Sequence, residues 1–177
     1  QQALAVIDMM VSQQESASYD WAYWDETYDL FVDRDIAKYT ERNLYTESID
    51  ALNLDMMAFI TTNGETLLSL TREDNPNTSS ELTAKMANQP TLQDYIKSMN
   101  HKLDIHRESI SGLFKINDSI WGLSLSPVRN SEGDRPSNGW MLWGRNLSLR
   151  FPGDFKSILT AENSLETQMI SESDSSQ

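Results

Sequence analysis

The sequence predicts a single α+β domain, in which a long N-terminal helix packs on one mainly antiparallel sheet of about five strands. Two features of the 177-residue chain predict this class. Apolar residues recur at helical spacing up to about residue 52, and neither Gly nor Pro occurs before Gly64. Beyond that point, apolar runs with strand periodicity form a hairpin and then a three-stranded meander.

Three helical segments are predicted at the start of the chain. The first covers residues 1–18, the second resumes at Asp20 and ends at about Asp33, and the third covers residues 35–52. Four aromatic residues of the second segment are expected to share one helix face, because they are three, four and three positions apart. They are Trp21, Trp24, Tyr28 and Phe31.

The first two strands are predicted within residues 54–71. Asn63-Gly64 separates two apolar runs there and predicts a type I′ hairpin turn. Residues 72–107 are polar and mixed in composition. Two short helices are expected in that stretch, over residues 79–89 and 91–100, opening with a Ser cap and a Thr cap respectively.

Three further strands are predicted over residues 108–116, 119–128 and 140–148, with a tight turn at Asn117-Asp118. A helix is expected from about Phe155, followed by a flexible polar tail. The single domain is therefore expected to contain a helical segment, a sheet core, and a C-terminal helix with its tail. These parts correspond to residues 1–50, 54–150 and 151–177.

The composition argues against several classes of function. The net charge of −13 argues against nucleic acid and anionic membrane surfaces as partners, because both are bound through clustered Lys and Arg. The chain has no Cys and only two His, and it contains no nucleophile elbow, phosphate loop or dinucleotide motif. Asp25 and Glu26 make a poor acid–base pair, since neighbouring residues on a helix point about 100° apart. We therefore expect no enzyme, no metal and no cofactor.

The segment "YDWAYWDETYDLFVD" mixes acidic and aromatic side chains, and three interpretations are open. Its acids can form a solvated helix face while its rings lie in the core. Alternatively, Asp25 beside Trp24 and Tyr28 can bind a cationic amine, through a charge-assisted hydrogen bond and cation–π attraction. A divalent cation on Asp25 and Asp29 is a weaker option, because calcium takes about six to eight oxygen ligands.

Arg145 is the complementary candidate, because it follows Trp143 on the same face of the last strand. It can be an edge residue, a structural partner of Asp25, or the group that binds a ligand carboxylate. An amine on Asp25 and a carboxylate on Arg145 would together describe an amino acid. The expected ligand-binding residues are Trp21, Trp24, Asp25, Tyr28, Trp143 and Arg145.

Residues 20–32, "DWAYWDETYDLFV", resemble the opening motif of the fourth type of CHASE domain, which reads W-D-D-x-Y-D-F. Trp24-Asp25 and Tyr28-Asp29 match this motif, whereas Glu26 replaces its second Asp and Leu30 its Phe. Three later stretches are also similar to this family, so the resemblance covers most of the chain. They are "YTERNL", "LNLDMMAFITTNGE", and the closing strands "ISGLFKINDSIWGLSLSPV" and "NGWMLWGRNL".

This resemblance implies an extracytoplasmic sensory domain that lies between two transmembrane helices of a bacterial or archaeal signalling protein. It also implies a PAS/Cache-like sheet behind the long helix. The cytoplasmic output would be a diguanylate cyclase, a cyclic-di-GMP phosphodiesterase or a histidine kinase. Residues 1–18 would then continue from the first membrane span, and residues 155–170 would lead to the second.

We therefore expect a periplasmic or extracellular sensor domain that is not an enzyme. A small, amine-containing molecule is expected to bind between the acidic aromatic helix and the sheet face of Trp143 and Arg145. A homodimer through residues 1–18 is also expected, because that segment has apolar positions beyond one stripe. The alternative is a protein-interaction or dimerisation module without a small-molecule ligand, in which the aromatic helix only forms core.

Overall fold

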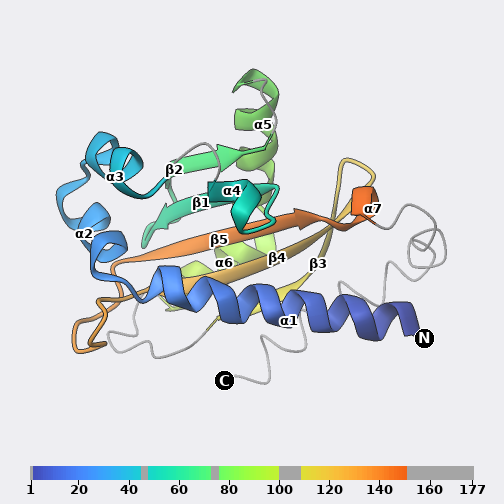
Figure 1. The fold of residues 1–177 in the computed structure, drawn as a ribbon, viewed down its shortest axis with the longest axis horizontal. Helices are drawn as coiled ribbons and strands as arrows, with labels where there is room; N and C mark the ends of the chain where they lie inside the picture. Colours follow the sequence, from blue (N-terminus) through green and yellow to red (C-terminus); the bar gives the residue numbers. More distant parts are fainter. Residues whose placement is uncertain (1, 45–47, 73–75, 100–108, 151–177) are drawn as a thin grey trace.

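The computed structural model describes residues 2–44, 48–72, 76–99 and 109–150. A five-stranded antiparallel sheet crosses the molecule, with helices on both of its faces (Figure 1). The elements are α1 (Gln2–Ala22), α2 (Asp25–Asp33), α3 (Ile36–Asn43), α4 (Ser48–Ala51), β1 (Met56–Thr61), β2 (Thr66–Thr71), α5 (Pro76–Ala87), α6 (Pro90–Met99), β3 (Ile110–Ile116), β4 (Ser119–Val128), β5 (Gly139–Asn146) and α7 (Leu147–Arg150). The predicted α+β class, with its N-terminal helix and its five-stranded antiparallel sheet, is confirmed.

The sheet has the strand order β2-β1-β5-β4-β3. The hairpin and the meander are therefore joined by the pairing of β1 with β5, where Ala58 lies opposite Leu142. This junction places the beginning of β1, the end of β2 and the end of β5 at one end of the sheet, because neighbouring strands are antiparallel. The beginning of β4 lies at that same end.

Helix α1 extends beyond the predicted residues 1–18 and ends at Ala22. Two non-helical residues then separate it from α2. Trp24 has extended backbone angles, φ −138° and ψ 133°. Tyr23 forms an isolated bridge with Arg129, whose N–H donates to the Ala22 carbonyl at 2.9 Å. The prediction of one continuous helix from Asp20 to about Asp33 is wrong, because the chain pairs with the end of β4 at this point.

The predicted third helical segment is also divided. Helix α3 begins after Asp35, whose side chain accepts a hydrogen bond from the Lys38 N–H at 3.0 Å and so caps the helix. It ends at Asn43, and the separate single turn of α4 precedes β1. Helices α3 and α4 therefore lie as two short pieces over the sheet face that α1 also covers (Figure 1).

The two tight turns differ from prediction in their type. In the β1–β2 turn only Gly64 has a positive φ, +88°, and its N–H donates to the Thr61 carbonyl at 2.9 Å. A type I′ turn needs positive φ at both central residues, so the type I′ prediction for Asn63-Gly64 is wrong. The β3–β4 turn has that signature instead, with φ of 50° at Asn117 and 63° at Asp118.

Two apolar cores lie on opposite faces of the sheet. Helices α5 and α6 cover one face, where Met86 and Ile96 pack against strand residues such as Leu142. Both helices begin at a proline, earlier than predicted, because Pro suits the first helical position. The other face carries α1 to α4. The helix predicted from Phe155 and its tail lie outside the residues that the structure describes.

Candidate ligand-binding site

Asp25, the central residue of the expected site, holds a loop of its own chain. Its Oδ1 accepts a hydrogen bond from the Ser131 N–H at 2.8 Å, and its N–H donates to Ser131 Oγ at 3.1 Å. Tyr28 donates its hydroxyl to the Pro136 carbonyl at 3.2 Å, and the Arg135 guanidinium lies 5.9 Å from the centre of its ring. Asp25 and Tyr28 thus anchor the β4–β5 loop onto α2.

The aromatic residues near Asp25 mainly form core. Trp143 is fully buried on the face that also buries Tyr28, and Trp21 packs against the same cluster. Trp21 and Trp24 meet edge to face, with their ring centres 5.6 Å apart. Asp29 remains exposed. This arrangement fits the interpretation of a solvated acidic face behind an aromatic core.

Arg145 lies at the other end of β5 from Asp25. It donates from Nε to the Asn53 carbonyl at 2.9 Å and from Nη2 to the Leu52 carbonyl at 3.2 Å. Burial, and then the neighbouring charge of Arg150, lower the pKa of Arg145. The option of a structural pair between Arg145 and Asp25 is wrong, because about six strand residues, roughly 20 Å, separate Arg145 from the loop that Asp25 holds.

A small hollow beside α2 does not provide the expected pocket. It lies between α2 and α3, has a volume of about 50 Å³, and is lined by acids including Glu26, Asp29 and Asp33. Ligand pockets usually measure about 300–1,000 Å³. Within the described ranges, no three His, Asp or Glu side chains converge as a metal site would require.

A larger cavity opens at the end of the sheet where β1 begins and β2 ends. This end cavity has a volume of about 540 Å³, within the usual range for small-molecule pockets. The inner part of its apolar wall includes Leu82 from α5, Ile116 from β3 and Trp121 from β4. These residues belong to the core that α5 and α6 cover, so the cavity continues that core outward.

Charged residues of both signs line the end cavity. Asp55 and Arg72 lie on the hairpin side, while Glu81 and Lys85 lie on α5, 3.7 Å apart as an exposed pair. Polar residues complete the lining, and they include Thr71, Asn117, Ser119 and Asn146. An apolar wall with a few converging charged groups is the usual composition of a small-molecule site.

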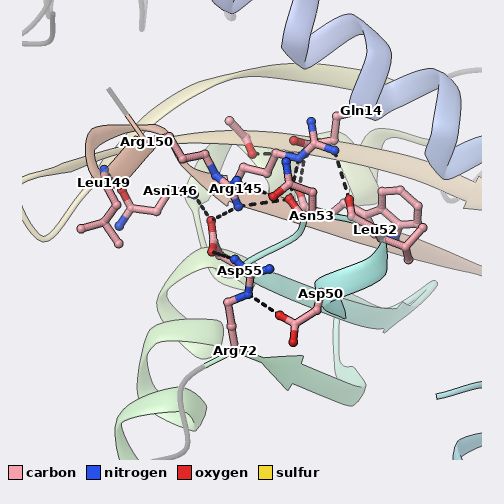
Figure 2. Close-up of polar contacts among 12 residues, drawn as sticks. Gln14, Asp50, Leu52, Asn53, Asp55, Arg72, Arg145, Asn146, Leu149 and Arg150 are labelled. Atoms are coloured by element: carbon pink, nitrogen blue, oxygen red, sulfur yellow. Dashed lines mark hydrogen bonds and ion pairs between the residues drawn. The ribbon is translucent and has the colours of Figure 1, made fainter. Parts of the chain in front are cut away.

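The Asp55 carboxylate lies close to three partners, Asn146, Arg150 and Arg72 (Figure 2). Its Oδ2 accepts from the Asn146 N–H at 2.7 Å and from Arg150 Nη2 at 3.1 Å. Its Oδ1 lies 3.8 Å from Arg72 Nη1, beyond hydrogen-bond distance. Arg72 Nε in turn contacts Asp50 at 2.6 Å.

Asp55 and Arg72 were not predicted as site residues, although the sequence carries a signal for their proximity. The two residues flank the hairpin, one before β1 and the other after β2. The register pairs Met56 with Thr71, so the flanking residues must also be neighbours, and the Arg72 N–H donates to the Asp55 carbonyl at 3.1 Å. Opposite charges at the two ends of a predicted hairpin would have indicated this pair.

These observations describe an α+β domain with a small-molecule-sized cavity at one end of its sheet. The model of the CHASE4 domain matches residues 6–165 of this chain. The chain therefore belongs to the CHASE4 family, whose members are sensory domains of signalling proteins. A search of curated proteins gives no match. Among the described helices, none is both long and apolar enough to cross a membrane.

Proposed function

We propose that this CHASE4 domain is the extracytoplasmic ligand-sensing part of a transmembrane signalling receptor. Its ligand is a small, amine-containing molecule, and its binding site is the end cavity. The receptor's output is a cyclic-di-GMP enzyme or a histidine kinase on the cytoplasmic side. The observation that carries this proposal is the cavity of about 540 Å³ in a chain that belongs to a sensory family.

The end cavity lies away from the ligand-binding residues that the sequence favoured. The binding role of Trp21, Trp24, Asp25, Tyr28, Trp143 and Arg145 stays a prediction. Asp25 and Tyr28 already bond to the β4–β5 loop, and Trp143 is fully buried. Asp55, which lines the end cavity, supplies the carboxylate that an amine needs. Its Oδ1 lies 3.8 Å from Arg72 Nη1, beyond hydrogen-bond distance.

The end cavity is also well placed to influence the rest of the domain. Asp55 pairs with Arg150 of α7, the last described element. Leu147, also in α7, belongs to the same buried cluster as Ile7 and Val11 of α1. A ligand can act as a signal only if it binds two states of the domain with different affinity. A ligand that changes the contacts of Asp55 would therefore shift α7, and through the shared cluster also α1.

The test is a thermal-shift screen of the purified chain against a broad set of small metabolites. The thermal shift of a ligand that occupies the end cavity should disappear in Thr71→Phe, because Thr71 lines the cavity. The strand should tolerate this change, since aromatic residues suit strands. Thr66→Phe is the matched control, because it makes the same change at the exposed opposite end of β2. If binders remain equally tight in Thr71→Phe, the end cavity is not the sensing site.

The alternative function is an interaction module that dimerises through α1. The specific observation in its favour is that Val6 and Met9 are 44% and 54% exposed on that helix. Sedimentation of the chain at increasing concentration tests it, with Val6→Lys and Met9→Lys in one variant and Ser12→Lys, an exposed polar site on α1, as control. Concentration-dependent association that only the first variant abolishes would support the dimer.

A further inference from the structure

We propose that the end cavity recognises a zwitterion of the amino-acid type, with its ammonium on Asp55, its carboxylate on Arg72 and an apolar substituent against Trp121. This inference rests on the proposed sensing function and specifies the ligand. The charged residues that line the cavity differ in how fully they are already paired, and among the described residues Asp55 and Arg72 keep groups free for a ligand.

The Asp55–Arg72 pair is open to a ligand. Asp55 Oδ2 is occupied by the Asn146 N–H and Arg150, whereas Oδ1 makes no hydrogen bond to any described residue and lies 3.8 Å from Arg72 Nη1. The Asp55 side chain is only 16% exposed, so an ammonium that reaches Oδ1 would be largely withdrawn from water. Charge-assisted hydrogen bonds strengthen in such surroundings.

Arg72 supplies the complementary donor next to that acceptor. It uses Nε on Asp50, and its Nη2 makes no hydrogen bond within the part of the chain that the structure describes. An acceptor and a donor therefore stand side by side on the same wall of the cavity. An α-amino acid carries its ammonium and carboxylate on one carbon atom, so its two charged groups match this adjacent pair.

The remaining lining indicates why a singly charged ligand fits less well. Glu81 and Lys85 neutralise each other on the α5 side of the cavity, 3.7 Å apart. Among the residues that the structure describes, the four charged residues of the lining thus sum to zero in a chain whose net charge is −13. A zwitterion leaves this balance unchanged, whereas an amine or a carboxylate alone leaves Arg72 or Asp55 without its counterpart. Leu82, Ile116 and Trp121 then offer an apolar surface to the substituent.

The experiment is isothermal titration of the chain with matched probes. They are L-leucine, 3-methylbutylamine (leucine without its carboxylate), 4-methylpentanoate (leucine without its ammonium) and 3-methylbutan-1-ol, with phenylalanine and its corresponding analogues as a second set. We expect the amino acid to bind about tenfold or more tightly than either singly charged analogue, as charged hydrogen bonds predict. If an analogue or the alcohol binds as tightly, the zwitterion assignment is overturned while small-molecule sensing stands.

Variants separate the two charged contacts. Arg72→Gln should weaken the amino acid about tenfold and leave the amine within about twofold. Asp55→Asn keeps an acceptor for the Asn146 N–H and should weaken both the amino acid and the amine. Lys85→Gln is the matched control inside the same cavity and should change neither affinity by more than about twofold, because Glu81 already pairs with Lys85. Equal losses in Arg72→Gln and Lys85→Gln would overturn the assignment of the carboxylate to Arg72.

The outcomes also distinguish this inference from the proposed function. If no probe binds while the metabolite screen finds a ligand that Thr71→Phe excludes, the ligand class is wrong and the sensing site is right. If neither the probes nor the screen gives a binder to the folded chain, with folding verified by circular dichroism, both proposals fail.

Discussion

Arg150 in α7 places its Nη2 3.1 Å from Oδ2 of Asp55 and so ties the end of β5 to the beginning of β1. The Arg150 and Asp55 side chains are only 20% and 16% exposed. Arg150 also donates to the Asn53 carbonyl at 3.1 Å, and Arg145 donates to the same oxygen at 2.9 Å (Figure 2). Two arginines, from the end of β5 and from α7, therefore hold the turn that precedes β1.

Arg150→Gln is expected to lower the free energy of unfolding by about 2 kcal/mol, because it leaves a largely buried carboxylate with one partner fewer. Urea unfolding measures this loss. Lys38→Gln serves as control, since it removes a 3.7 Å pair with Asp33 whose side chains are 50% and 43% exposed. That change should cost less than about 0.5 kcal/mol. Equal effects of the two substitutions would contradict the structural role of Arg150.

Gln14→Leu is expected to destabilise the docking of α1 on the sheet. Gln14 is buried, and its Nε2 lies 3.0 Å from the Trp143 carbonyl and 3.2 Å from the Gly122 carbonyl. An apolar side chain of similar size leaves these acceptors without their donor, at a cost of about 1–3 kcal/mol. The neighbouring exposed residue gives the matched control, and Gln13→Leu should change the free energy of unfolding by less than about 0.5 kcal/mol. Chemical unfolding of both variants decides the question.

Gly139→Ala is expected to cost about 1–3 kcal/mol through overpacking. A Cβ atom at Gly139 would lie 2.6 Å from Cδ1 of the Phe31 ring, which rests on the strand at this point. A double-mutant cycle with Phe31→Leu checks the cause, because the smaller side chain should relieve part of the loss. Strictly additive losses in the cycle would show that the ring contact is not the reason.

Tyr39→Phe is expected to change how stability depends on pH. Burial raises the pKa of Tyr39 above its ordinary value of about 10, and Thr27 lies 2.9 Å from its hydroxyl. The neutral phenol therefore stabilises the fold fully below about pH 10, and this contribution is lost as the pH rises toward the raised pKa, by about 1.4 kcal/mol per pH unit.

The variant should lose about 1 kcal/mol at pH 7, from the missing hydrogen bond, and should decline less steeply above pH 10 than the unsubstituted chain. Unfolding by urea at several values between pH 7 and 11 measures both effects. Parallel curves for the two proteins would show that Tyr39 is not responsible for the alkaline loss.

Much of the fold was predictable because its signals are local. The five strands and both helices of the middle stretch follow apolar periodicity, and the turns follow Gly, Asn and Asp. Boundaries were less predictable where a distant segment intervenes. The break at Tyr23-Trp24 depends on the bridge to Arg129, which lies more than a hundred positions further along the chain. No pattern within residues 19–33 carries that information.

The site expected from the sequence and the proposed end cavity use the same residue types at different positions. The sequence indicated a carboxylate and an arginine for an amino-acid-like ligand, and it favoured Asp25 and Arg145 because aromatic residues surround them. In the structure these two residues lie at different ends of β5 and serve the β4–β5 loop and the α4–β1 turn. Asp55 and Arg72 flank the hairpin outside the acidic aromatic segment, and the register of the hairpin makes them neighbours.

The sequence by itself determined the fold class, the order of the elements and the family resemblance that the CHASE4 match confirmed. Periodicity, turn residues and motifs act over a few neighbouring positions, so they can be read directly. Only the tertiary structure decided which charges meet and where a cavity remains. Asp55 and Arg150 are 95 positions apart, and their contact exists because the antiparallel pairing of β1 with β5 brings the two strand ends together.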